Sequence, residues 1–102
     1  MNAAKLLLRA GAVGMLAAAL APAQAQTPPA GRLLASNCFQ CHGTNGKGPG
    51  FDRLAGKSSK EIYSELLEFR AGKEGNGIMA RHSMGYTDAQ LKLIANYFAT
   101  QR

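Results

Sequence analysis

Cys38, Cys41 and His42 are the residues whose types and spacing point to chemistry in this chain. They form the pattern C-x-x-C-H, which is the attachment signature for c-type haem. Two thiols three positions apart can reach two vinyl groups on one side of a porphyrin, and the histidine that follows can direct its imidazole at the iron. The pattern also uses both cysteines of the chain. The sequence therefore predicts one covalent haem, with Cys38 and Cys41 as thioether attachment points and His42 as the proximal iron ligand.

The two thiols have three other possible roles besides haem attachment. A thioredoxin-like redox pair is expected in a βαβ setting, whereas the sequence around these cysteines reads as helical. A zinc site needs four ligands, and His82 could be the fourth. The 39 residues between His42 and His82 fit no common zinc finger, however. A structural disulfide would leave His42 without a role.

The distal ligand of the iron is expected to be a methionine or a histidine, as is usual in an electron carrier. Beyond residue 25 the chain offers Met79, Met84 and His82, all within the Gly-rich segment 72–86. Met79 follows a flexible Gly-Asn-Gly turn that could lay the chain across a haem face, and this favours it weakly. From the residues alone, all three candidates stay open.

Residues 1–25 have the layout of a secretory signal peptide. Lys5 and Arg9 precede an Ala-rich apolar stretch over 10–20, and Ala23-Gln24-Ala25 is a small-x-small cleavage signal. The apolar stretch is shorter than the roughly 20 residues of a membrane span. We therefore expect cleavage, a mature domain over residues 26–102 without a membrane anchor, and a periplasmic location. Thioether formation, which needs reduced thiols and follows export, agrees with this expectation.

The length and charge of the chain limit its possible functions. Of 102 residues, 12 are Lys or Arg and six are Asp or Glu, a net charge of +6. Removing Lys5 and Arg9 with the signal leaves ten basic against six acidic residues, or +4, on 77 residues. A domain this short has a small hydrophobic core and needs an additional source of stability, such as a disulfide, a metal or a cofactor. An exported basic protein is not expected to bind nucleic acid. Its charge either steers docking to an acidic protein partner or only solvates the surface.

Three helices are expected to position the predicted site. They span residues 31–38, from 58 or 59 to 72, and 87–102. Ser58 with Glu61, and Thr87 with Gln90, match the capping-box pattern at the start of the second and third helices. Apolar residues in the third helix recur at helical spacing, at Leu91, Ile94, Ala95 and Phe98.

The segments 43–57 and 72–86 are Gly-rich and show neither helical nor strand periodicity. Two structureless loops of this length are unusual in a small domain, unless they wrap a bound group. Pro49 could turn the chain so that a nearby carbonyl accepts a hydrogen bond from the His42 ring. Leu34 and Tyr97 are expected to pack the first helix against the last.

The chain after the signal resembles a small class I cytochrome c. Within that class it is most similar to the haem subunit of flavocytochrome c sulfide dehydrogenase. The stretches that carry the resemblance are Asn37–Thr44, Phe69–Gly72, Ile78–Met79, Gly85–Thr87 and Ala95–Phe98.

The resemblance implies an all-α fold of three to four helices wrapped around one covalently attached haem c. It also implies that Met79, six residues before Gly85, is the distal iron ligand. Such a protein is not an enzyme but a one-electron carrier. By resemblance, a separate flavoprotein subunit would oxidise sulfide and pass electrons through this haem to a periplasmic acceptor.

Two other classes of function stay open from the sequence. The first is a free-standing soluble shuttle between a respiratory complex and a terminal oxidase, and a stable complex with a flavoprotein would argue against it. The second is a ligand-binding or catalytic haem protein with an open iron position. Binding of carbon monoxide to the reduced protein would support that second class.

Overall fold

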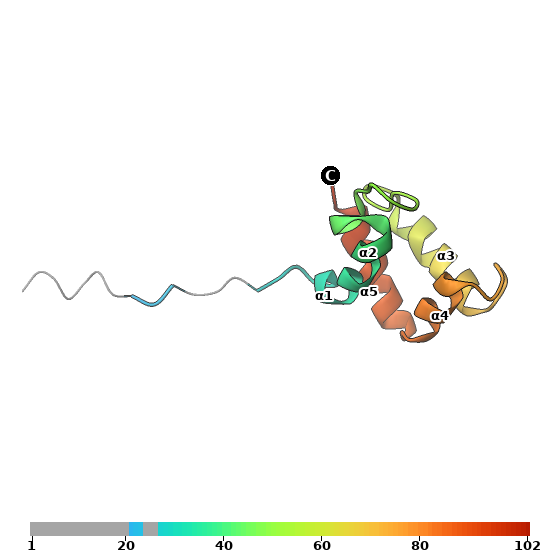
Figure 1. The fold of residues 1–102 in the computed structure, drawn as a ribbon. Coiled ribbons are helices and arrows are strands. Elements are labelled where there is room, and N and C mark those ends of the chain that lie inside the picture. Colours follow the sequence, from blue (N-terminus) through green and yellow to red (C-terminus); the bar gives the residue numbers. More distant parts are fainter. Residues whose placement is uncertain (1–20, 24–26) are drawn as a thin grey trace, which may run out of the picture.

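A computed structural model describes residues 21–23 and 27–102, so most of the predicted signal peptide lies outside the described residues. Within them the fold is all-helical, as predicted, and contains no strand. Figure 1 shows the helices gathered into one globule. None of the described helices has the length and apolar character that a membrane span requires.

The first helical region is longer than the predicted segment 31–38. It runs through α1 (Arg32–Ala35), the 3₁₀ turn η3 (Ser36–Cys38) and α2 (Phe39–His42). The whole C-x-x-C-H motif therefore lies on consecutive helical turns. Gly43 ends the run, with φ at 85° and its N–H donating to the carbonyl of Phe39. With ψ at 160°, this positive φ is a backbone conformation that is open essentially to glycine alone, and it turns the chain out of the helix.

The start of α1 packs closely against α5 (Asp88–Ala99). Gly31, the N-cap of α1, has φ at 81°, and a methyl group there would collide with the carbonyl oxygen of Leu93. The absence of a side chain thus lets the two backbones approach. Leu34 packs on the core cluster that includes Tyr97, and α1 contacts α5, as expected from the sequence.

The helices α3 (Ser59–Arg70) and α5 begin where their caps predict. The Ser58 side chain accepts a hydrogen bond from the N–H of Glu61, and Thr87 forms a complete capping box with Gln90. These bonds satisfy backbone donors that have no partner within a helix. The end of α5 differs from the prediction, because the helix stops at Ala99 and Arg102 lies beyond it.

The expectation of a structureless segment 72–86 is wrong. Residues Ile78–Met84 form helix α4, which packs on α3. The helix buries Ala80 and Ser83, and Met79 is half-buried. Seven residues are too few to show a clear helical period, and an isolated helix of that length is unstable in water. Its stability comes from tertiary packing, which the sequence pattern does not display.

The core joins α5 to the first helical region and to α3. The predicted stripe on α5 is buried along its whole length, and Phe98 has no exposed surface. The rings of Phe39, Tyr97 and Phe98 pack with centroids 5.7–6.3 Å apart, two of the three pairs edge to face. Edge-to-face contacts of this kind stabilise beyond the burial of their area.

Candidate haem-binding site

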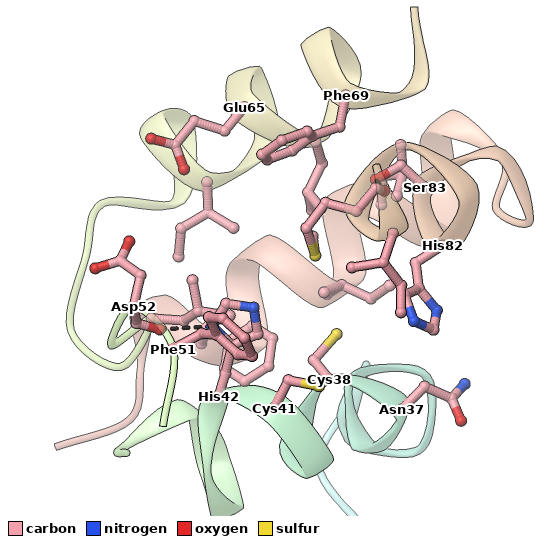
Figure 2. Close-up of a pocket in the computed structure, with 18 of the residues that line it drawn as sticks. Asn37, Cys38, Cys41, His42, Phe51, Asp52, Glu65, Phe69, His82 and Ser83 are labelled. Carbon is pink, nitrogen blue, oxygen red and sulfur yellow. Dashed lines mark hydrogen bonds between the residues drawn. The ribbon is translucent and has the colours of Figure 1, made fainter. Parts of the chain in front are cut away.

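A cavity of about 580 Å³ lies between the C-x-x-C-H region and the helices α3, α4 and α5. Its walls are largely apolar, which suits a large, flat, mostly apolar cofactor. Figure 2 shows Cys38, Cys41 and His42 beside the cavity, with Phe69 of α3 and His82 and Ser83 of α4 on its other sides. The apolar lining includes Phe51, Leu54, Ile62, Leu66, Phe69, Ile78, Met79, Leu91, Ile94 and Phe98.

Cys38 and Cys41 line the cavity together. Residues three apart on a helix share a face, so both sulfurs border the same space. No disulfide joins them. Burial, with a smaller contribution from Cys41, raises the pKa of the Cys38 thiol to about 11. A redox-active thiol needs a lowered pKa, so this environment disfavours the thioredoxin-like interpretation.

The zinc interpretation finds no matching cluster in the part of the chain that the structure describes. Within those residues, no three His, Cys, Asp or Glu side chains are grouped as ligands for a metal ion. His82 lines the same cavity as His42 but stands on α4, whereas His42 stands on α2.

His42 is buried and its ring is held by a hydrogen bond to the chain. Nδ1 lies 2.6 Å from the carbonyl oxygen of Asp52 (dashed in Figure 2). Because a carbonyl can only accept, Nδ1 carries the proton and donates it. The lone pair of Nε2 is then free to bind a metal. A histidine bonded in this way has a fixed orientation and is a stronger electron donor to iron.

The carbonyl that holds His42 belongs to Asp52, three residues beyond Pro49. The N–H groups of Gly48 and Phe51 donate to the carbonyls of His42 and Cys41, each at 2.8 Å. These carbonyls end a helix and have no partner within it. The loop after the motif thus binds the end of α2, and this brings the Asp52 carbonyl under the imidazole. The sequence predicted such a bond but not its acceptor.

The side chain of Asp52 is held in turn by Lys57, whose Nζ lies 2.5 Å from a carboxylate oxygen. A hydrogen bond and charge attraction from Lys57 lower the pKa of Asp52, and those from Asp52 raise the pKa of Lys57. The ion pair therefore links the first and last residues of the segment 52–57. Exposed pairs contribute little to stability, so its main effect is on the loop that carries the Asp52 carbonyl.

We predict that Lys57→Met lowers the stability of the protein slightly at pH 7. The pKa of Asp52 is lower in the folded than in the unfolded state. The pair therefore stabilises above the unfolded pKa of about 3.9, and its contribution is lost as the pH falls through the folded pKa. The difference in denaturant midpoint between wild type and variant should shrink from pH 7 to about pH 3. Lys60→Met, at an exposed neighbour outside the pair, is the control. An equal difference at both pH values would contradict the assignment.

The three candidate distal ligands occupy different surroundings. Met79 and His82, both on α4, line the cavity, and Met79 also packs on the core. Met84, at the end of α4, is 58% exposed and does not line the cavity. The Ser83 hydroxyl donates to the Met79 carbonyl at 2.7 Å, inside the same helical turn. Of the three candidates, the Met79 thioether and the His82 imidazole therefore line the cavity, and Met84 does not.

A polar pair that the sequence analysis did not single out also lines the cavity. The Asn37 amide donates to the hydroxyl of Tyr86 at 2.9 Å, and Arg70 donates to the Tyr86 carbonyl and pairs with Asp88. These bonds connect the first helical region, the end of α3 and the start of α5. In the sequence, residues 85–87 indicate only the resemblance to cytochromes c. The contact between Tyr86 and Asn37 depends on the tertiary structure.

These features fit a covalently attached haem. The cavity has an apolar lining and a size suited to a cofactor, two thiols border one side of it, and a buried imidazole presents Nε2. The loop 43–57 is docked on the helix that carries those groups. Together the helical fold and this site define a c-type haem protein.

Comparisons with known proteins agree with this class. The sequence profile of the family described as Cytochrome c matches residues 29–102. The cytochrome subunit of sulfide dehydrogenase from Chlorobaculum tepidum is 38% identical over 69 residues, which are 67% of this chain and 63% of that protein. Cytochrome c-552 of Acidithiobacillus ferridurans is 38% identical over 64 residues, or 62% of this chain and 28% of that protein. Cytochrome c-554(547) of Halothiobacillus neapolitanus is 34% identical over 80 residues, or 67% of this chain and 88% of that protein.

The chain therefore belongs to the cytochrome c family. It carries haem c in covalent linkage, and its single C-x-x-C-H motif makes it a monohaem electron-transfer protein. It spans less than two thirds of the length of the first two relatives, 63% and 28%.

Proposed function

We propose that this cytochrome is the haem subunit of a sulfide dehydrogenase and accepts electrons from a flavoprotein. Similarity to the cytochrome subunit from Chlorobaculum tepidum supports this role. In the proposal, Cys38 and Cys41 hold the haem, His42 is the proximal ligand and Met79 is the distal one. The signal-peptide pattern in residues 1–25 supports export, and the proposed location is the periplasm.

The haem supplies one-electron chemistry, because its iron alternates between the ferrous and ferric states. The chain contributes the surroundings. His42 would bind the iron through Nε2, because its Nδ1 proton is held by the Asp52 carbonyl and the orientation of the ring is fixed. A Met79 thioether favours the ferrous state and so raises the reduction potential, which suits an electron acceptor. The largely apolar lining of the cavity would limit the access of water to the iron.

The single observation that carries the axial assignment is the placement of Met79. It lies on the cavity wall, on a helix other than the one that carries His42, whereas Met84 lies outside the cavity. The two walls belong to α2 and α4, which lie on different sides of the cavity in Figure 2. A cofactor between them has donors available on both faces.

Spectroscopy of Met79→Ala tests this assignment. We expect the ferric wild-type protein to show the near-infrared charge-transfer band of a thioether–iron bond, and the variant to lose it. The reduction potential should also fall, within the span of roughly 0.8 V that axial ligands control. Met84→Ala is the matched control, since Met84 is exposed, and it should keep both properties. A band that persists in Met79→Ala and disappears in Met84→Ala would overturn the assignment.

Rapid-mixing kinetics test whether a flavoprotein is the electron donor. The ferric cytochrome is mixed anaerobically with sulfide, with or without the co-purified flavoprotein subunit of a sulfide dehydrogenase from the same source. The proposal expects fast reduction only when the flavoprotein is present, together with a stable complex on gel filtration. Equally slow reduction in both mixtures, with no complex, would favour the free-standing shuttle instead.

A further inference from the structure

Helix α4 has two side chains at the same cavity whose types can bind haem iron, a thioether and an imidazole. Met79 and His82 both line it, and they are three residues apart. On an α-helix this spacing places two side chains about 60° apart around the axis and about 4.5 Å apart along it. A displacement of less than one turn therefore exchanges one donor for the other.

The imidazole of His82 has the freedom to act as a ligand. The residue is exposed on its outer side while it borders the cavity. Among the hydrogen bonds of the described residues, none involves its ring, whereas Nδ1 of His42 is fixed by Asp52. Figure 2 shows His82 at the edge of the cavity on the side of Cys38 and Asn37. An imidazole so placed can turn without breaking a bond to the protein.

The helix that carries both donors packs on α3, but its two ends are weakly fixed. Gly77 caps its N-terminus without a side-chain hydrogen bond, and Gly85 follows its C-terminus. Residues 71–77, which lead into it, are all exposed. Only Ala80 and Ser83 of the seven helical residues are buried. Segments with few buried contacts are those that shift at low free-energy cost.

We propose that His82 is a second distal ligand of the iron and replaces Met79 in a fraction of the ferric molecules. This inference rests on the proposed role of Met79 as the distal ligand. A soft thioether favours ferrous iron, whereas an imidazole suits ferric iron better. In the exchange the iron–sulfur bond breaks and a bond from the iron to the lone pair of a His82 ring nitrogen forms, with no change in the oxidation state of the iron. The reduced protein keeps Met79, and oxidation shifts the population toward His82.

The experiment uses the haem-loaded protein and four variants: Met79→Ala, His82→Ala, the double variant of both, and Met84→Ala as control. Covalent haem content and far-ultraviolet circular dichroism confirm that each variant folds. The readouts are low-temperature electron paramagnetic resonance of the ferric form, the near-infrared band, and carbon monoxide binding to the ferrous form.

We expect two low-spin signals in the ferric wild type and one in His82→Ala, with a stronger near-infrared band in that variant. Met79→Ala should stay low-spin, and the double variant should become high-spin and bind carbon monoxide readily. Identical ferric spectra of wild type and His82→Ala, or a high-spin Met79→Ala, would overturn the inference while leaving Met79 as the ligand. Persistence of the near-infrared band in Met79→Ala would instead show failure of the axial assignment itself.

Discussion

Phe98→Ala is expected to reduce the free energy of unfolding by about 3–5 kcal/mol, the range typical for truncating a buried aromatic residue. Phe98 has no exposed surface. Its ring packs on Phe39 of the haem-attachment helix and on Tyr97, and it also borders the cavity. The alanine therefore removes packing against α2, against Tyr97 and along the cavity wall, and it leaves a void in the core.

Thermal and denaturant unfolding of the haem-loaded variant measure this effect. In a domain of this size each kcal/mol corresponds to about 4–8 °C, so the melting temperature should fall by more than about 10 °C. Leu33→Ala is the matched control. Leu33 is 82% exposed on α1, and its truncation should stay within about 0.5 kcal/mol of wild type. A loss below about 1 kcal/mol for Phe98→Ala would contradict this account of the core.

Replacing Cys38 and Cys41 together by serine is expected to abolish covalent haem attachment and, with it, the stable fold. A cavity of about 580 Å³ would then depend on haem held by non-covalent contacts alone. Without haem, the apolar side chains that line this volume would be exposed to water or to an unfilled space, and both are unfavourable. The chain without haem cannot maintain this shape.

Extraction with acidified organic solvent separates free from covalent haem. All haem of the double variant should enter the solvent, and the extracted chain should lose most of its helical circular dichroism signal. Gln40→Ala is the control, because Gln40 lies between the two cysteines and is exposed. It should retain its haem and its helices. A double variant that stays folded after extraction would show that the four-helix scaffold is stable without the cofactor.

The features that the sequence predicted correctly are local ones. The C-x-x-C-H pattern places two thiols and an imidazole within five residues, so helical geometry alone brings them to the same cavity. The starts of α3 and α5 were readable because a capping side chain bonds to a backbone only three residues away. The apolar stripe on α5 was readable because twelve residues display the helical period.

What the tertiary structure decided is which distant groups meet. Helix α4 was not predicted because its seven residues are too few to show a helical period, and it is stabilised by packing on α3. The acceptor for His42 is the Asp52 carbonyl, because the loop is docked by hydrogen bonds to the end of α2. The orientation of α4 places Met79 and His82 at the cavity and Met84 outside it. Periodicity and capping report contacts between residues a few positions apart, whereas the surroundings of an iron ligand depend on how separate helices pack.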